Sequence, residues 1–219
     1  MDTPVFARRT DLMDRTVSAS LYNLVIGLTL CWGLLINWWM VTSIPVGAIR
    51  DIHPLLFIGG YLLSGLAGIY LFHRSNRPWV SFVGYNLVVV PFGLVVNLAV
   101  SRYDASLVTD AIRVTAFATL VMLTLGTLFP RVFARIPGAL TVALLAVLVV
   151  ELVEILVFNI RHAMIDWLVV LIFCGYIGYD WGRANQIPKT IDNAIDSAAA
   201  LYMDIINLFL RILRILGRK

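Results

Sequence analysis

Residues 78–100 read PWVSFVGYNLVVVPFGLVVNLAV, a stretch without a single charged side chain. A helix crosses the roughly 30 Å hydrocarbon core of a bilayer with about 20 such residues, because each residue adds about 1.5 Å. Similar stretches recur along the chain: apolar residues make up 60% of its 219 residues and charged residues only 14%. A soluble domain carries roughly 25% charged residues. The composition therefore excludes both a soluble domain and a disordered chain, and it indicates a polytopic membrane protein.

Seven stretches are apolar and long enough, or nearly so, to cross the membrane as helices. They lie at residues 20–43, 54–72, 78–100, 107–128, 138–158, 164–182 and 198–215. The connections are short, so we expect one all-α membrane domain over residues 1–219 with antiparallel neighbouring helices. The polar start MDTPVFARRTDLMDR is unlike a secretory signal, so we expect the first span to be retained.

Arginines and lysines in the short connections indicate the orientation of the chain. With the N-terminus inside, nine of them lie on the inner side and three on the outer side. We therefore expect a cytoplasmic N-terminus, and the compact chain without retention signals favours the plasma (inner) membrane of a bacterium. The basic tail from Arg211 onward would lie outside if the last segment crosses fully, or inside if it re-enters. These basic residues act as topology signals, so we expect a lipid bilayer and no nucleic acid as partner.

Small and polar residues inside the spans are typical of helix packing. Gly60, Ser64 and Gly68 form a small-residue stripe on the second span, which permits close approach of another backbone. Asn86 and Asn97 share one side of the third span. We interpret both features as packing devices.

Charged side chains inside a span are costly and indicate function by default. Arg113 and Glu151 lie at about the same depth, roughly 10 Å from the outer ends of the fourth and fifth spans. Glu154 shares a helix face with Glu151, and Asp110 is a further candidate partner. We favour a buried ion pair that locks two helices over the alternative, an outer vestibule that attracts cations. Asp166 lies near the outer edge, where an acid is ordinary.

Asp180 and Asp204 form a second constellation in the inner third of the membrane. By helical rise, Asp180 lies about 24 Å from the outer end of the sixth span, and Asp204 about 9 Å into the seventh span from its inner end. Two carboxylates at one depth in a low dielectric cannot both ionise without a large cost, so a neighbouring pair would share a proton. This arrangement would be a proton-sensitive latch between two helices. The alternative is two acids that are bonded separately at an interface, and depth does not decide between them.

The residues around this pair resemble the Bax inhibitor-1 family, also called the transmembrane Bax inhibitor motif family. The resemblance lies in IFCGYIGYDWGRA (172–184) and ALYMDIINLFLRILRILGRK (200–219), with a weaker likeness in LYNLVIGLTLCW (21–32). The resemblance implies seven transmembrane helices, with six wrapped around a central C-terminal helix. It also implies that Asp180 and Asp204 form a hydrogen-bonded pH sensor beside a closed pore.

The resemblance implies a pH-sensitive calcium leak channel that is gated by protonation of these two aspartates. Calcium would be the permeant ion, held weakly by the two carboxylates, and no cofactor is expected. The chain departs from the family's Asp-Thr-Gln motif, because Trp181 and Gly182 follow Asp180. The span 54–72 also has no basic residue, where some family members place an arginine. Both departures concern the details of gating.

Two other classes of function compete with the channel. One is an interaction protein that regulates another membrane complex, such as a protease or a stress factor, through its basic tail. The other is a proton-coupled transporter that relays protons through Glu151 and Glu154, although inverted repeats are not evident. We predict that the chain is not an enzyme, because it carries no GxSxG or HExxH motif and its histidines are far apart in sequence.

Overall fold

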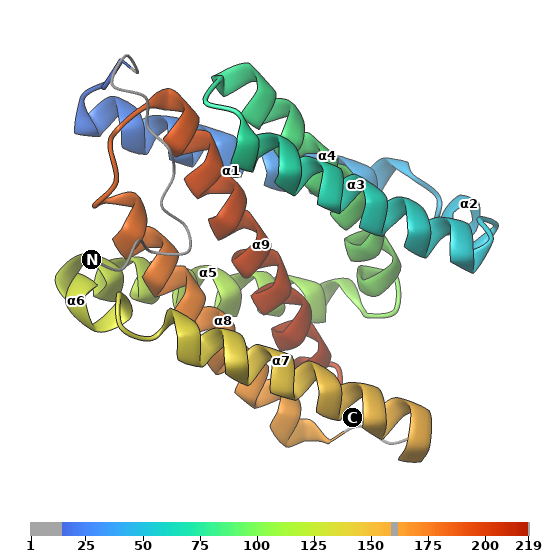
Figure 1. Cartoon of the computed structure of the whole chain (residues 1–219). Coiled ribbons are helices and arrows are strands. Elements are labelled where there is room, and N and C mark those ends of the chain that lie inside the picture. Colours follow the sequence, from blue (N-terminus) through green and yellow to red (C-terminus); the bar gives the residue numbers. More distant parts are fainter. Residues whose placement is uncertain (1–14, 159–161, 219) are drawn as a thin grey trace. The chain divides into compact units, whose positions relative to one another are not determined.

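The structure is a computed structural model that describes residues 15–158 and 162–218. The described residues form helices and connections, with no β-strand among them (Figure 1). The elements are α1 (Ala19–Ser43), α2 (Val46–Arg50), α3 (Pro54–Arg74), α4 (Pro78–Val100), α5 (Ala105–Leu128), α6 (Pro130–Phe133), α7 (Pro137–Val153), the π-helical turn η1 (Glu154–Phe158), α8 (Ala163–Ala184) and α9 (Ile191–Leu216). The polar start at 1–14 and Arg161, which is one of the three basic residues counted on the outer side, lie outside the described residues.

Within the part of the chain that the structure describes, five helices are long and apolar enough to cross a membrane, namely α1, Pro54–Phe72 of α3, α4, α5 and α8. Each of them coincides with a predicted span to within two residues. The chain is therefore a multi-pass membrane protein with an all-helical fold. The predicted span at 138–158 corresponds to the shorter apolar helix α7 followed by η1.

The seventh predicted segment differs most from the structure, because α9 begins at Ile191 rather than at 198. Hydropathy misses the first turns of this helix, since they contain Asp192, Asn193 and Asp196. The structure nevertheless buries all three side chains. Asp192 accepts a hydrogen bond of 2.6 Å from the Ser81 hydroxyl of α4.

Helix starts follow from local sequence. Proline is the first residue of α3, α4, α6 and α7, where its missing N–H costs nothing and its fixed φ angle suits the first turn. Ser18 caps α1, because its hydroxyl oxygen accepts a hydrogen bond of 3.2 Å from the backbone N–H of Leu21.

The chain divides into two compact units, and the predicted single membrane domain remains a prediction. The first unit comprises Met1–Leu98 with Ile187–Ala199, and the second comprises Ala99–Gln186 with Ala200–Lys219. The first turns of α9 therefore belong to the first unit and the rest of α9 to the second.

In the first unit, the two asparagines that were predicted to pack helices both connect α4 to α1. The Asn97 amide donates hydrogen bonds of 2.9 and 3.0 Å to the carbonyl oxygens of Met40 and Ile44 at the end of α1. Asn86 accepts a hydrogen bond of 2.9 Å from the indole N–H of Trp32, also in α1. The packing role predicted for the two asparagines is confirmed.

The small-residue stripe of α3 meets α4 at two of its three positions. The Ser64 hydroxyl donates a hydrogen bond of 2.7 Å to the carbonyl oxygen of Leu87. A Cβ atom added to Gly68 would lie 2.5 Å from the carbonyl oxygen of Gly84, so the two backbones are in contact there. Gly60, by contrast, has no neighbouring atom within 4 Å of such a Cβ.

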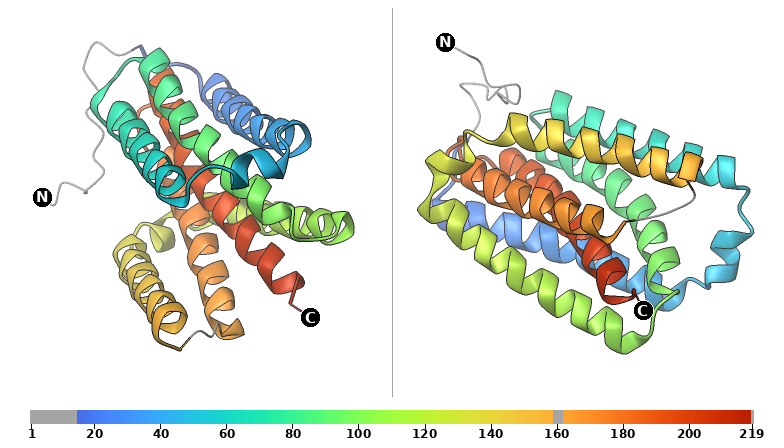
Figure 2. Two further views of the ribbon diagram at one scale, coloured as in Figure 1. Left: turned by 90° about the vertical axis from the view of Figure 1, so that its right-hand side faces the viewer. Right: turned by 90° about the horizontal axis from the view of Figure 1, so that it is seen from below.

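In the second unit, α8 packs against α5, α6 and α7 (Figure 2). The approach of α8 to α5 is close at Gly126 and Gly178, where an added Cβ on Gly126 would lie 2.5 Å from the Gly178 carbonyl oxygen. This contact sets the position of the C-terminal half of α8, which carries Asp180.

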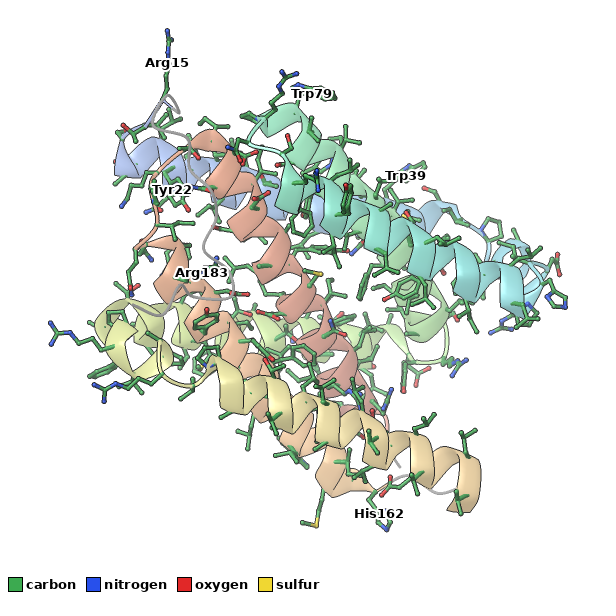
Figure 3. The ribbon with its side chains drawn as sticks, in the orientation of Figure 1. Arg15, Tyr22, Trp39, Trp79, His162 and Arg183 are labelled. Atoms are coloured by element: carbon green, nitrogen blue, oxygen red, sulfur yellow. The ribbon has the colours of Figure 1, made fainter. Side chains whose placement is uncertain are left out.

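Large apolar side chains remain exposed along the helices that are long enough to span a membrane. On α3, Leu55, Leu56 and Leu63 are all more than 70% exposed. Trp39 and Trp79 are exposed as well (Figure 3). Surfaces of this kind are unfavourable in water and suit contact with lipid chains.

Candidate functional site

The structure brings Asp180 of α8 and Asp204 of α9 together in the second unit. The Asp180 side chain is a hydrogen-bond partner of Asp204 and the charged group that acts on it most strongly. Asp204 is only 8% exposed, and Asp180 is half-buried. We call these two residues the aspartate pair. Their contact means that the two acids are not bonded separately at unrelated places.

One oxygen of the pair lacks a partner within the described structure. The Oδ2 atom of Asp204 is buried and accepts no hydrogen bond there. A buried carboxylate oxygen without a donor is costly, and it is relieved when it binds a proton or a cation.

The residue that replaces the threonine of the family motif has a defined role in the structure. The Trp181 indole N–H donates a hydrogen bond of 2.8 Å to the Thr127 hydroxyl of α5. An added Cβ on Gly182 would lie 3.3 Å from the carbonyl oxygen of Gly126, so the next position along α8 is also close to α5. Trp181 and Gly182 thus tie the end of α8 that bears Asp180 to α5.

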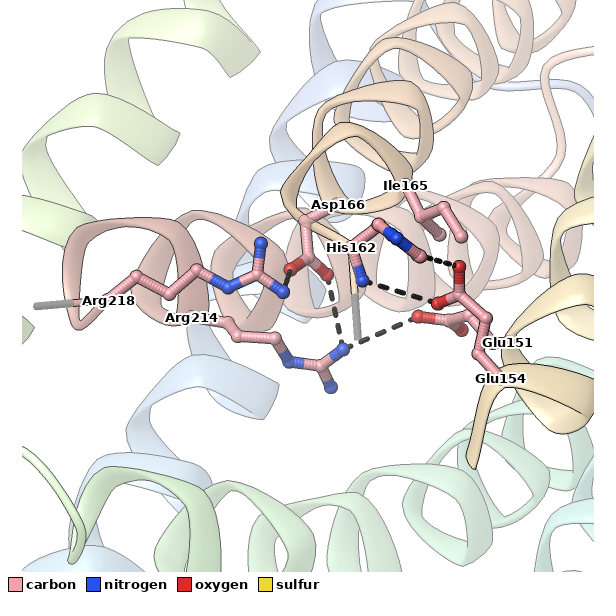
Figure 4. Close-up of a pocket in the computed structure, with 7 residues that line it drawn as sticks. All are labelled: Glu151, Glu154, His162, Ile165, Asp166, Arg214 and Arg218. Carbon is pink, nitrogen blue, oxygen red and sulfur yellow. Dashed lines mark hydrogen bonds and ion pairs between the residues drawn. The ribbon is translucent and has the colours of Figure 1, made fainter. Parts of the chain in front are cut away.

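At the other end of α8, a second group of charges joins three helices. It consists of Arg211 and Arg214 from α9, Arg218 two residues beyond the end of α9, Glu151 from α7 and Asp166 from α8, and we call it the arginine cluster (Figure 4). Figure 4 shows these residues, apart from Arg211, around a small pocket that His162, Glu154 and Ile165 also line.

Asp166 is the most heavily paired acid of the arginine cluster. Its Oδ1 atom lies 2.9 Å from Arg211 Nη1 and 3.1 Å from Arg214 Nη1, and its Oδ2 atom lies 3.1 Å from Arg218 Nη2. The Asp166 side chain is only 2% exposed. Arg211 also binds both carboxylate oxygens of Glu151, through a contact of 2.7 Å at Oε2 and a second one at Oε1.

Of the predicted outer cluster, the structure shows the Arg113–Asp110 contact but not the expected Arg113–Glu151 ion pair. Arg113 pairs with Asp110 on its own helix at 3.4 Å, and the two side chains are 75% and 57% exposed. Glu151 pairs with Arg211 and Arg214 instead of Arg113. Matching depth did not predict the right pair, because the side chain of Arg113 lies on an exposed face of α5.

Glu154 bonds to the start of α8. Its Oε1 atom lies 2.5 Å from Nδ1 of His162, and its Oε2 atom accepts a hydrogen bond of 3.3 Å from the His162 backbone N–H. Within residues 15–158 and 162–218, His, Cys, Asp and Glu side chains do not gather in threes in a way that could hold a metal ion.

Sequence reasoning missed the role of Asp166. We expected an ordinary acid near the outer edge, and we left the side of the basic tail open. A signal was present in the spacing, since Asp204, Arg211 and Arg218 lie seven residues apart and therefore fall on one face of a helix. A charged stripe on a membrane helix requires counter-charges on its neighbours, and Asp166 and Glu151 were the acids at that depth.

Comparisons with known proteins place the chain among membrane proteins of one family. A family model described as inhibitor of apoptosis-promoting Bax1 matches residues 14–219. Bax inhibitor 1 of Schizosaccharomyces pombe is 26% identical, over 80% of this chain and 77% of that protein. Protein LIFEGUARD 3 of Arabidopsis thaliana is 30% identical over 69% of this chain and 62% of its own length. An uncharacterized membrane protein of Streptococcus pyogenes serotype M3 is 28% identical over the full length of both chains.

Proposed function

Because the chain belongs to the Bax inhibitor-1 family, we propose that it is a pH-sensitive leak channel for calcium, gated by protonation of the aspartate pair. The observation that carries this proposal is the contact between Asp180 and Asp204, two acids from neighbouring helices, one of them almost fully buried. A pair of this kind in a membrane protein has no structural advantage over apolar packing, so a functional role accounts for it best.

The direction of the pH response follows from the hydrogen bond within the pair. Two carboxyl groups can bond to each other only while they hold at least one proton between them. When that proton leaves, two negative charges face each other in a low dielectric and repel. Ionised acids also attract cations. We therefore propose that the path is closed when the pair holds a proton and that leak increases as pH rises.

Calcium would bind the pair only briefly. Calcium takes about six to eight oxygen ligands, whereas two carboxylates supply at most four. Water would have to supply the rest, which makes a weak site. A weak site suits permeation, because an ion must leave as readily as it enters. Calcium is the transported ion in this proposal, and no resident cofactor is included in it.

The proposal includes a topology. We propose seven spans, namely the five long apolar helices together with α7 continued by η1, and α9. In chain order they are α1, α3, α4, α5, α7 with η1, α8 and α9. The resemblance implies that the last of them lies at the centre of the other six. We further propose the plasma (inner) membrane of a bacterium, and the full-length similarity to a streptococcal membrane protein supports a bacterial membrane. The proposed cytoplasmic N-terminus rests on the arginines and lysines of the short connections.

Calcium flux into liposomes tests the channel directly. The purified protein would be reconstituted and its flux recorded between about pH 5 and 8, beside Asp180→Asn and Asp204→Asn. An asparagine amide can donate a hydrogen bond without a titrating proton. Both variants should therefore show, at every pH, the low flux that the wild type shows at acidic pH. Wild-type flux should rise with pH.

Two results would contradict the channel. Flux with unchanged pH dependence in both variants would remove the pair from gating. If gel filtration shows that the protein is folded and no flux is recorded at any pH, the alternative function is favoured. In that case the chain is a membrane protein that regulates another membrane complex. The name Bax inhibitor 1 of the yeast relative describes a regulator and favours that second candidate.

A further inference from the structure

We propose that Asp166 is a positioning residue for the aspartate pair. Its ion pairs to Arg211, Arg214 and Arg218 anchor the C-terminal end of α9 to α8. In doing so they set the register that holds Asp204 opposite Asp180. The inference rests on the proposed function of the aspartate pair, but the register that it describes can be measured without any channel activity.

The register of α8 against α9 is visible in the residue numbers. Asp166 and Asp180 are fourteen residues apart on α8, and their partners Arg218 and Asp204 are fourteen residues apart along α9 and its end. The two contacts run in opposite order, so the two segments are antiparallel. Fourteen helical residues span about 21 Å and return to within about 40° of the same face. One seam therefore carries both contacts.

This geometry couples the two ends of the seam. If α9 slid by one residue along α8, its side chains would move about 1.5 Å and turn by about 100°. Asp204 would then leave Asp180, and Arg218 would leave Asp166, in the same step. Whatever fixes one contact therefore fixes the other.

The arginine cluster stabilises that register more strongly than the aspartate pair does. Asp166 is 2% exposed and Arg211 is 14% exposed, and buried opposite charges in contact are costly to separate because each would remain unpaired. Glu151 adds a second acid from α7, and Glu154 with His162 lines the same pocket. With Asp166 neutral, Arg211 and Arg214 would keep the carboxylate of Glu151, and Arg218 would lose its ion pair with Asp166.

The two ends of the seam carry interactions of opposite sign. At the arginine cluster, opposite charges attract. At the aspartate pair, like charges repel once the shared proton is lost. The helix end that bears Asp180 is also tied to α5 through Trp181 and Thr127. Loss of the proton would therefore separate α9 from α8 locally at the pair, while the cluster keeps the far end in place.

Disulfide formation at the aspartate pair measures the register. The variant Asp180→Cys/Asp204→Cys would be made in a chain with Cys31→Ser and Cys174→Ser, which removes the native thiols. The rate of cross-linking by a mild oxidant in liposomes at fixed pH reports how often positions 180 and 204 meet. Adding Asp166→Asn should lower this rate at least tenfold, whereas Asp166→Glu should restore most of it.

Asp110→Asn is the matched control, because it removes an acid of the same unit whose ion pair with Arg113 is exposed. It should leave the cross-linking rate unchanged. Arg218→Gln is the milder variant, since Arg218 is 31% exposed and Asp166 would keep two arginines. It should lower the rate by an intermediate factor, and it keeps the test valid if Asp166→Asn does not fold.

An unchanged cross-linking rate in Asp166→Asn or, where that variant does not fold, in Arg218→Gln would overturn the inference. The calcium assay separates this failure from failure of the channel. In a working channel, Asp166→Asn should shift the pH profile of flux, and Asp110→Asn should not. Cross-linking that depends on Asp166 in a protein without flux would sustain the positioning role and reject the channel.

Discussion

At the scale of single residues, the most informative position is Trp181. The family motif places a threonine there, and the sequence alone indicated only lost polarity and added bulk beside Asp180. The structure gives the indole a specific partner, the hydroxyl of Thr127 on α5. A tryptophan N–H inside a membrane protein requires such an acceptor, so this position makes a polar contact even though the threonine is absent.

We predict that this hydrogen bond stabilises the fold. Trp181→Phe and Thr127→Val should each lower the free energy of unfolding by about 1 kcal/mol, because each removes this hydrogen bond and Thr127→Val leaves the indole N–H without its acceptor. The double variant should cost clearly less than the sum of the two. Denaturation of the protein in detergent micelles gives the three values. Additive losses would show that the two side chains do not interact.

The residue contacts expected from the sequence were of two kinds, since one rested on depth together with a family motif and the other on depth alone. Asp180 and Asp204 were paired on both grounds, and the structure brings them together. Arg113 and Glu151 were paired on depth alone. Depth fixes a level in the membrane but not the direction in which a side chain points, so the partners of Glu151 could not be identified in this way.

At the scale of helices, apolar runs determined most of the elements. The bounds of α4 coincide with the predicted span, because Pro78 starts the helix and the apolar run ends at Val100. The start of α9 was missed, because its first turns are polar yet buried against Ser81 and Tyr22. Hydropathy records the preference of a residue for lipid, and it does not detect polar side chains that are satisfied by other polar side chains.

The contact between α3 and α4 gives a prediction for two glycines on one helix. Gly68→Ala should destabilise the protein by roughly 1–3 kcal/mol, because the added methyl group would meet the backbone of Gly84 and force the helices apart. Gly60→Ala is the control on the same helix, with no atom within 4 Å of the new Cβ. Its stability should equal or slightly exceed that of the wild type. Equal losses in both variants would mean that the close contact is absent in the membrane.

At the scale of the whole molecule, composition predicted a multi-pass membrane protein, and the five long apolar helices confirm it. The division into two units left no trace in the sequence. One of its boundaries lies between Ala199 and Ala200, within the continuous helix α9, where neither a linker nor a change in composition marks it. Sequence methods find domain borders at flexible connections, so a border inside a helix escapes them.

The predicted orientation gives a test on intact cells. In a chain without native cysteines, His162→Cys should react with a membrane-impermeant thiol reagent from outside, because this position precedes α8 on the predicted outer side and its side chain is 61% exposed. Arg131→Cys in α6 is the matched variant for the opposite side and should react only after the cells are permeabilised. The reverse pattern of labelling would place the N-terminus outside.

The polar first turns of α9 bear on how the protein is made. A nascent helix enters the lipid from the translocon according to its own hydrophobicity, and acids and arginines oppose this step. Asp192, Asp196 and Asp204, with Arg211 and Arg214, make α9 a poor candidate for such entry on its own. Ser81 and Asp166, which bond to these side chains, lie in helices synthesised earlier. We therefore expect the helices to enter the membrane in order. The earlier helices would be inserted first, and α9 would then insert by pairing its charged side chains with theirs.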